Sequence, residues 1–368
     1  MKKAHVFRLL MVVLTILVGG IVLETGSCLY LRTDRERDKA LRIFDRSEGG
    51  GVADIGIKKN FSQTWWHEDF SVRVVTNNIG LREDFDYNGE RIDIGFLGDS
   101  FTFGHGVNAG ERYSDRLREY FPDAYIVTFS YMNGWTTPHY YFFLKQNPRF
   151  RPAIAILGLF LGNDLTADIE ETELVFDDAG ELVNVVAFKQ EVHPKGFFVT
   201  TDHNPFTNGL RRFSFGELLL RTKVLRKIGV VPDLAEIDTY PPIEFDRGRL
   251  NETAMVGLEY IRKIHELQSA ESKRLVVLLI PWDFYVGDYV SYPSHETARD
   301  LRENQYLPRA ILNWCEENGV ECVDPIPYFK SLEEQGKRLY FPNDEHWNEN
   351  GHAAAARVLH DYLATARP

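Results

Sequence analysis

The sequence of 368 residues predicts an α/β protein whose parallel sheet is covered by helices on both faces. From residue 92 onward, short apolar runs alternate with helical patterns, and parallel strands need such helical crossovers between them. Polar residues follow the ends of these runs, which is where open α/β sheets bind their ligands. The length suits one large domain with an insertion, or two smaller domains.

Composition narrows the possible partners. The net charge is −12, and no basic patch is interleaved with aromatic residues, so we expect no nucleic acid partner. The acidity favours solubility and does not identify a substrate. Three cysteines are too few for a disulfide framework and lack the pairing of a zinc site. Cys315 and Cys322 either form a bridge outside the cytoplasm or are two buried free thiols.

The amino terminus has the pattern of a signal anchor. Three basic residues precede an uncharged apolar run at 9–23, and continuing past Glu24 to Leu31 gives a segment long enough for a transmembrane helix, which needs about 20 residues. We therefore interpret residues 1–32 as a retained anchor. A signal peptide cleaved near the small residues before Cys28 and lipid attachment at Cys28 are the alternatives.

The orientation of this anchor is indicated by two conflicting signals. Five Lys and Arg residues follow the apolar run in 32–42 and only three precede it, which would keep the folded domain in the cytoplasm. A short basic tail before an apolar core is nevertheless the layout of an export signal. We expect the folded domain to be extracytoplasmic, in the periplasm or outside the cell.

We divide the remainder into a juxtamembrane helix with a β-rich apron at 33–90 and an α/β domain at 91–368, which carries an insertion at 165–250. Glycines 49–51 mark a break between the charged helix and the apron. In the α/β domain, strands are predicted from apolar runs, a hairpin from its turn at 178–180, and helix ends from stop signals such as Gly319. The expected strands are 92–97, 124–129, 153–159, 275–280 and 320–323, the hairpin is 173–186, and the expected helices are 33–45, 111–121, 137–146, 213–228, 251–269, 298–318 and 348–364.

Residues that suit nucleophilic catalysis follow the strands. Ser100 follows the first strand, Asn163 and Asp164 follow the third, and Asp344 and His346 precede the last helix. A serine hydroxyl needs an imidazole to take its proton, and that imidazole needs a carboxylate to fix its tautomer. In an extended loop, Asp344 and His346 point to the same side.

The same chemistry needs donors for the oxyanion that develops during acyl transfer. We expect these donors to be the backbone N–H groups of Ser100 and Tyr131 and the side-chain amide of Asn163. This chemistry requires no cofactor and no metal.

Each motif also has a structural interpretation. Gly98-Asp99-Ser100 has the composition of a turn, Asn163-Asp164 that of a helix cap, and His346 could be a hydrogen-bonded core histidine. Asp344, His346 and His352 could hold a metal, but the last two do not share a helix face. The glycines at 98–106 have neither the Walker spacing nor Gly-x-Gly-x-x-Gly.

Three motifs together resemble the SGNH (GDSL-type) hydrolases. The residues at 98–104 (GDSFTFG) resemble block I, those at 162–164 (GND) block III, and those at 344–352 (DEHWNENGH) block V. The stretch 78–82 (NIGLR) resembles the lead-in of membrane-anchored members. The resemblance extends over about 70–365 and implies a flavodoxin-like three-layer α/β/α sandwich, the SGNH hydrolase fold.

The resemblance implies a role for each site residue. Ser100 would be the nucleophile and an oxyanion donor, Asn163 another donor, His346 the base and Asp344 its partner. Block II usually offers a glycine N–H, whereas Tyr131 aligns there. Many members place the aspartate three residues before the histidine, where this chain has Asn343. The spacing found here resembles that of polysaccharide O-acetyltransferase relatives.

The leading hypothesis is a membrane-anchored serine esterase that removes acyl or acetyl groups from a small molecule or from an envelope glycan or lipid. An O-acyltransferase with the same triad is the second hypothesis. A non-catalytic binding module on the same fold is the third.

Overall fold

The structure is a computed structural model that describes residues 15, 18–28, 57–67, 69–130, 135–165, 172–186, 250, 252–289 and 295–365. The chain forms two compact units, one made of Met1–Arg42 and Val192–Pro242, the other of Ile43–Glu191 and Ile243–Pro368. The expected helices at 33–45 and 213–228, the break at 49–51 and Tyr131 lie outside the described residues.

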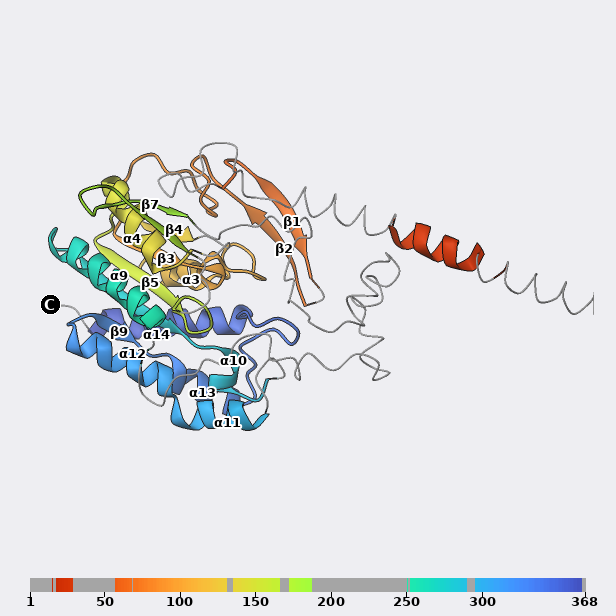
Figure 1. The fold of residues 1–368 in the computed structure, drawn as a ribbon. Helices are drawn as coiled ribbons and strands as arrows, with labels where there is room; N and C mark the ends of the chain where they lie inside the picture. Colours follow the sequence, from red (N-terminus) through yellow and green to blue (C-terminus); the bar gives the residue numbers. More distant parts are fainter. Residues whose placement is uncertain are drawn as a thin grey trace, which may run out of the picture. The chain divides into compact units, whose positions relative to one another are not determined.

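The described part of the first unit is a helix at 18–28, drawn in red in Figure 1. Its Thr25 hydroxyl donates to the carbonyl of Ile21 at 2.7 Å. Across the described residues, every helix is too short or too polar to cross a membrane.

The second unit is built on a five-stranded parallel sheet, which confirms the predicted α/β class (Figure 1). The strand order is β4-β3-β5-β8-β9, so the chain starts near one edge, steps outward once and then crosses to the other side. This is the order of flavodoxin-like sheets. The five strands are β3 (Ile94–Gly98), β4 (Ile126–Ser130), β5 (Ile154–Phe160), β8 (Arg274–Ile280) and β9 (Glu321–Val323).

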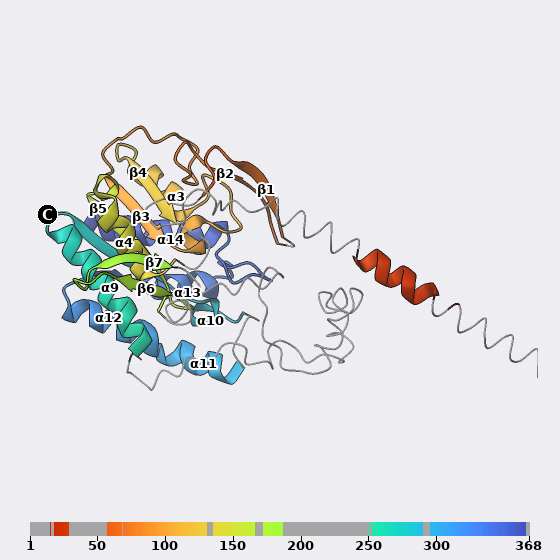
Figure 2. The same ribbon diagram turned by 45° about the horizontal axis from the view of Figure 1, so that its top comes forward.

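Helices cover both faces of the sheet. The pair α3 and α14 packs together, and the pair α4 and α9 packs together, as Figures 1 and 2 show. Every residue of β3 and β4 is buried, as expected for strands covered on both faces. The helices are α2 (Ser100–Phe103), α3 (Tyr113–Tyr120), α4 (Thr137–Gln146), η1 (Pro148–Phe150), α9 (Glu252–Ser269), α10 (Asp283–Val286), α11 (His295–Asn304), α12 (Tyr306–Glu317), α13 (Ile326–Glu334) and α14 (Glu349–Thr365).

Two antiparallel hairpins lie outside the main sheet. The first, β1 (Ser62–Trp66) with β2 (Ser71–Val75), forms the predicted β-rich stretch. The second, β6 (Glu173–Phe176) with β7 (Leu182–Val186), matches the predicted hairpin and packs on α4.

The single helix predicted at 298–318 is wrong, because two helices meet at Gln305. Gln305 has a left-handed backbone with φ 50°. Pro308 explains the break: in a continuous helix its ring would clash with the carbonyl of Asn304, four residues earlier. In the first turn of a new helix, proline is tolerated.

Two further helices were not foreseen. The first helix after β3 was expected about ten residues beyond Ser100, yet α2 begins at Ser100 itself. The second, α13, follows Asp324, whose carboxylate accepts the N–H of Ile326 at 2.9 Å. Its buried Ile326 and Phe329 stand three residues apart, at helical spacing.

Arg82 ties the segment before β3 to the loop that follows Ser100. Its buried guanidinium donates hydrogen bonds to the carbonyls of Phe103, Gly104 and Val107 and lies over the Phe103 ring. The carbonyl of Gly104 also accepts the backbone N–H of Val107 at 3.2 Å. Arg82 therefore holds the turn against the rest of the unit.

Glu83 makes a second connection from the same segment. One carboxylate oxygen accepts the backbone N–H of Thr128 in β4 at 2.8 Å, and the other accepts from Arg112 and Arg118 at 2.8 and 2.9 Å. Arg112 also pairs with Asp115 at 2.7 Å. A fully buried guanidinium is thereby matched by two carboxylates.

We expect Arg82→Leu to lower the free energy of unfolding by about 2–5 kcal/mol, because it leaves three buried carbonyls without a charged donor. Urea denaturation followed by circular dichroism measures this. Arg116→Leu is the control: Arg116 pairs with exposed Glu119, and such surface pairs are worth about 0–1 kcal/mol. Equal losses in the two variants would contradict the role of Arg82.

Candidate active site

Ser100 stands at the carboxyl end of β3, on the first turn of α2. Asp99 caps this helix, since its carboxylate accepts the N–H of Phe101 at 3.0 Å. Gly104 ends the helix with a left-handed φ of 82°, which favours glycine. The turn that composition suggested is therefore a capped helical turn, which presents the Ser100 hydroxyl at the edge of the sheet.

The position of α2 depends on a close approach to two strands. A Cβ atom on Gly98 would lie 1.9 Å from the hydroxyl oxygen of Thr102, and one on Gly158 would lie 2.6 Å from it. The Thr102 hydroxyl also hydrogen-bonds that of Tyr113 at 2.8 Å. Glycine in both strands thus lets the helix settle directly on the sheet, which fixes the height of Ser100.

The loop that carries Asp344 and His346 is closed at its base. Tyr340 and Trp347 form an isolated antiparallel bridge, and the N–H of Phe341 donates to the carbonyl of His346 at 3.1 Å. Beyond the loop, the Asn348 side chain accepts the N–H groups of residues 350 and 351 at 2.9 and 3.2 Å and so caps α14.

The structure joins Ser100, His346 and Asp344 in one hydrogen-bonded chain. His346 Nε2 lies 2.7 Å from Ser100 Oγ, and His346 Nδ1 lies 2.5 Å from Asp344 Oδ1. The backbone N–H of His346 donates to the same oxygen at 2.9 Å. This arrangement orients the imidazole so that one nitrogen faces the carboxylate and the other the hydroxyl.

The electrostatics of this hydrogen-bonded site favour an ionised Asp344 beside a protonated His346. Burial opposes ionisation of Asp344, but its interactions with His105 and His346 outweigh burial and hold the pKa of that carboxyl well below its usual range. For His346, burial disfavours the imidazolium, yet the hydrogen bond and charge of Asp344 prevail and raise the pKa of the ring. A proton that reaches His346 is thereby stabilised.

His105 lies next to Asp344 and His346, and the sequence analysis did not identify it. Its Nε2 lies 3.5 Å from Asp344 Oδ2, and its ring centroid lies 4.5 Å from that of His346. Phe70, at the end of the β1–β2 hairpin, packs edge-on against His105 at 5.1 Å. A histidine between two glycines just after block I was the available signal, but sequence alone could not place it against residue 344.

The hairpin is also bonded to the loop that carries Asp344 and His346. The Asp69 carboxylate accepts the backbone and side-chain N–H groups of Asn343 at 2.9 and 2.8 Å. Asn343 stands three residues before His346, where many relatives carry the aspartate, and here it anchors the hairpin.

The predicted oxyanion donors are only partly placed. Asn163 lies in the turn after β5, the strand that pairs with β3, so it stands at the same edge of the sheet as Ser100. The neighbouring Asp164 is buried and accepts the N–H of Phe160 at 2.8 Å, which stabilises this turn. Tyr131 lies outside the described residues.

The possible metal set of Asp344, His346 and His352 is not assembled. His352 accepts the N–H of Tyr113 at 3.2 Å and stacks on the Tyr113 ring, and burial lowers its pKa to about 3. His105, Asp344 and His346 do offer ligand atoms within 4.8 Å of one another. Tetrahedral zinc ligands, however, stand about 3.3 Å apart, whereas Asp344 and His346 make a hydrogen bond of 2.5 Å.

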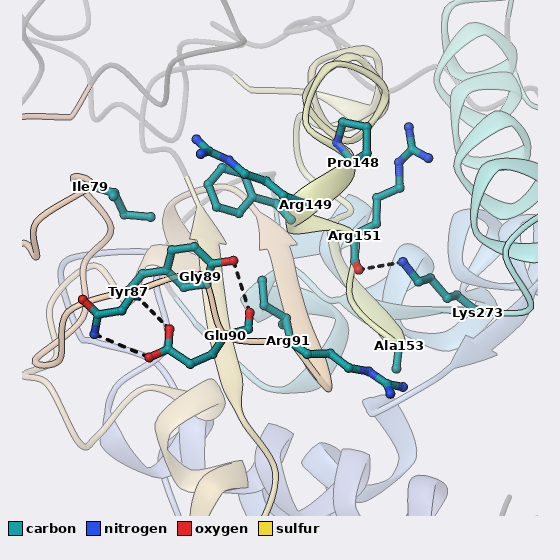
Figure 3. Close-up of a pocket in the computed structure, with 13 residues that line it drawn as sticks. Ile79, Tyr87, Gly89, Glu90, Arg91, Pro148, Arg149, Arg151, Ala153 and Lys273 are labelled. Atoms are coloured by element: carbon teal, nitrogen blue, oxygen red, sulfur yellow. Dashed lines mark hydrogen bonds between the residues drawn. The ribbon is translucent and has the colours of Figure 1, made fainter.

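A cavity of about 650 Å³ lies at the opposite edge of the sheet (Figure 3). Its lining includes Ala153 and Lys273, which directly precede β5 and β8. Figure 3 shows the guanidinium groups of Arg91 and Arg149 extending in different directions, and Lys273 donates to the Arg151 carbonyl at 2.9 Å. These cations do not converge on one point, so the cavity is no compact anion site.

The parallel sheet and the hydrogen bonds among Ser100, His346 and Asp344 suit an α/β serine hydrolase, and a family comparison agrees. The family model described as "GDSL-like Lipase/Acylhydrolase family" matches residues 96–354. Since the match extends over more than half of the chain, the protein belongs to this family of ester-hydrolysing serine hydrolases. No protein of curated function matches the sequence.

The solved structures that resemble this chain are distant in sequence. A member of the lipolytic protein G-D-S-L family from Veillonella parvula is 10% identical, with a TM-score of 0.36, over 74% of this chain and 98% of its own. The esterase EstA from a Pseudoalteromonas species is 10% identical, with a TM-score of 0.38, over 74% and 97%. The acetyl xylan esterase AlAXEase is 12% identical, with a TM-score of 0.38, over 74% and 100%.

We expect Asp99→Asn to gain stability relative to the parent as the pH rises. Burial raises the pKa of Asp99 from 3.8 to about 6, so the folded state binds a proton that the unfolded state releases between these values. The parent therefore loses stability, on the order of 1–3 kcal/mol, as the pH rises through about 6, and the amide does not.

Urea midpoints at pH 4, 5.5 and 7 measure this difference. The amide keeps the oxygen that caps α2, so helix capping is conserved. Asp84→Asn, at an exposed position, is the control. If the stabilities of Asp99→Asn and the parent change in parallel across this pH range, Asp99 does not titrate with a raised pKa.

Proposed function

We propose that the protein hydrolyses acyl esters with Ser100 as nucleophile, His346 as base and Asp344 as the orienting carboxylate. The observation that carries this proposal is the unbroken hydrogen-bond chain, with contacts of 2.7 and 2.5 Å. A nucleophile and base within this distance, with the base oriented by a third group, are what acyl transfer needs. The proposed substrates are acyl or acetyl esters of a small molecule, a glycan or a lipid.

The reaction proceeds in two stages, in which Ser100 is first acylated and then deacylated. Ser100 Oγ attacks the ester carbonyl while His346 Nε2 takes the hydroxyl proton, and Asp344 stabilises the resulting imidazolium. The imidazolium then gives this proton to the leaving alcohol as the ester bond breaks, which leaves an acyl group on Ser100. Water, deprotonated by the same nitrogen, then attacks the acyl group. The bond to Ser100 Oγ breaks, the imidazolium returns its proton to that oxygen, and the carboxylic acid leaves.

The oxyanion of each tetrahedral intermediate needs donors near Ser100. We assign the backbone N–H of Ser100, on the first turn of α2, where helical N–H groups have no intrahelical acceptor. The Asn163 amide and the backbone N–H of Tyr131 complete the proposed set, on the strength of the motif resemblance and, for Asn163, its place at the same sheet edge.

We further propose that a membrane anchor at 1–32 holds the enzyme outside the cytoplasm. A basic tail followed by an apolar run supports this. The disulfide between Cys315 and Cys322 gives independent support, because such bonds persist in oxidising compartments and are rare in the cytosol.

We expect Ser100→Ala to reduce hydrolysis of a short activated ester such as p-nitrophenyl acetate by about 10⁴-fold or more, because the nucleophile is removed. Labelling by a fluorophosphonate should disappear as well. Ser71→Ala, an exposed serine on β2, is the matched control and should keep both activities. Circular dichroism checks that the variants remain folded.

Other outcomes of this experiment separate the competing functions. Full esterase activity in folded Ser100→Ala would overturn the triad. Transfer of the acyl group to an added oligosaccharide in preference to water would identify an O-acyltransferase. A parent protein that neither turns over esters nor reacts with the fluorophosphonate would be a binding module.

For the membrane anchor, we expect alkaline phosphatase fused after residue 368 to be active in a bacterial host, because this reporter folds only after export. The full-length fusion should also stay in membranes washed with carbonate, and deletion of residues 1–32 should abolish both results. If green fluorescent protein fused at the same position fluoresces while the phosphatase fusion is inactive, the enzyme lies in the cytoplasm.

A further inference from the structure

His105 occupies the side of the Asp344 carboxylate that His346 leaves open. His346 binds Oδ1 through both its ring and its backbone N–H, whereas His105 Nε2 lies 3.5 Å from Oδ2. Each carboxylate oxygen thus faces its own imidazole. The terminal torsion χ2 of an aspartate is broadly distributed, so a contact on the second oxygen restricts rotation of the carboxylate plane.

The surroundings of His105 determine which of its nitrogens carries the proton. Its Nδ1 is buried and has no hydrogen-bond partner among the residues that the structure describes. A proton on Nδ1 would therefore be left without an acceptor, which is costly in a buried site. The neutral ring with its proton on Nε2 instead directs that proton to Asp344 Oδ2, 3.5 Å away.

The position of His105 is fixed from two directions. Phe70 packs edge-on against the ring at 5.1 Å, and Trp65 of the same hairpin lies 6.2 Å away. On the other side, Arg82 binds the carbonyls of Phe103 and Gly104, which directly precede His105. A side chain held this way can transmit a fixed geometry to the carboxylate.

The charged and titratable groups that face His105 are Asp344, His346 and Arg82. The hairpin brings two more titratable groups nearby, but His67 stacks on Phe70 and Asp69 binds Asn343. Burial and the charge of His346 lower the pKa of His105, which agrees with a neutral donor.

We propose that His105 is a positioning residue, which holds the Asp344 carboxylate in the plane that aligns His346 with Ser100. This inference rests on the proposed triad. It also gives a reason for the short spacing between Asp344 and His346: with both donors of His346 on one oxygen, the other oxygen needs a donor from elsewhere in the fold.

A pair of variants separates hydrogen bonding from packing. His105→Phe keeps an aromatic ring against Phe70 but removes the donor, whereas His105→Gln keeps an N–H near the position of Nε2. We expect the Phe variant to lose about 10- to 100-fold in kcat with little change in KM, because a misplaced base slows the chemical step. The Gln variant should recover most of this loss.

The pH profile provides a readout that packing alone would not change. Asp344 raises the pKa of His346 above 6.5, and activity needs the neutral ring, so the acid limb of kcat/KM in the parent lies above pH 6.5. A loosened carboxylate stabilises the imidazolium less. The acid limb of His105→Phe should therefore move to lower pH, and that of the Gln variant should stay near the parent.

His360→Phe is the matched control, since His360 stacks on Tyr120 and contacts Asp361. It should keep the parent kcat and acid limb. A Phe variant at position 105 with parental kcat and limb would overturn the inference, and so would a Gln variant as impaired as the Phe variant.

A second measurement tests the inference independently of esterase activity. The proton between His346 and Asp344 should give a downfield NMR signal that shifts or broadens in His105→Phe and is retained in His105→Gln. An unchanged signal in both variants would overturn the positioning role. Loss of the signal in an enzyme that does not cleave esters would support the positioning role and reject only the proposed function.

Discussion

The hydrogen bond between His346 and Ser100 joins residues 246 positions apart in the chain, and most features of the site serve to bring these two atoms within 2.7 Å. On one side, glycines in β3 and β5 let α2 rest on the sheet, so Ser100 has a fixed height. On the other side, the bridge at Tyr340 and Trp347 closes the loop and Asn348 caps the helix after it. An error in either support would separate the two atoms, because neither side chain is long enough to compensate.

The site also places three carboxyl groups around one imidazole and gives them different protonation tendencies. Burial raises the pKa of Asp99 to about 6 and also raises that of Glu345. Asp344 is the exception, because it receives the N–H groups of His346 and faces His105. Asp344 is also less deeply buried than Asp99, so burial opposes its ionisation less while the imidazoles favour it. It is also the carboxyl that hydrogen-bonds the ring of His346.

Sequence reasoning succeeded where the information is local. Buried parallel strands appear as apolar runs, and glycine or polar residues at their ends predicted the edge where Ser100 stands. The residues Ser100, His346 and Asp344 could be proposed together because each type has a distinct chemical role. The break at Gln305 was also encoded locally, in Pro308, because proline is not tolerated inside a continuous helix. The proximity of His105 and Asp344 could not be predicted, since it depends on how a hairpin and two loops fold onto each other.

Residues 57–67 and 69–90 are the described part of the predicted stretch at 33–90, and they are bonded into the interior of the α/β domain. Glu83 supplies one of the two carboxylates that neutralise the buried Arg112, and it also satisfies an N–H of β4. A gene fragment that starts at residue 91 would therefore encode a domain with a buried guanidinium short of a partner and a turn without Arg82. The smallest fragment worth expressing for crystallisation or directed evolution therefore begins ahead of β1. The segment before the family motifs is part of the folded enzyme.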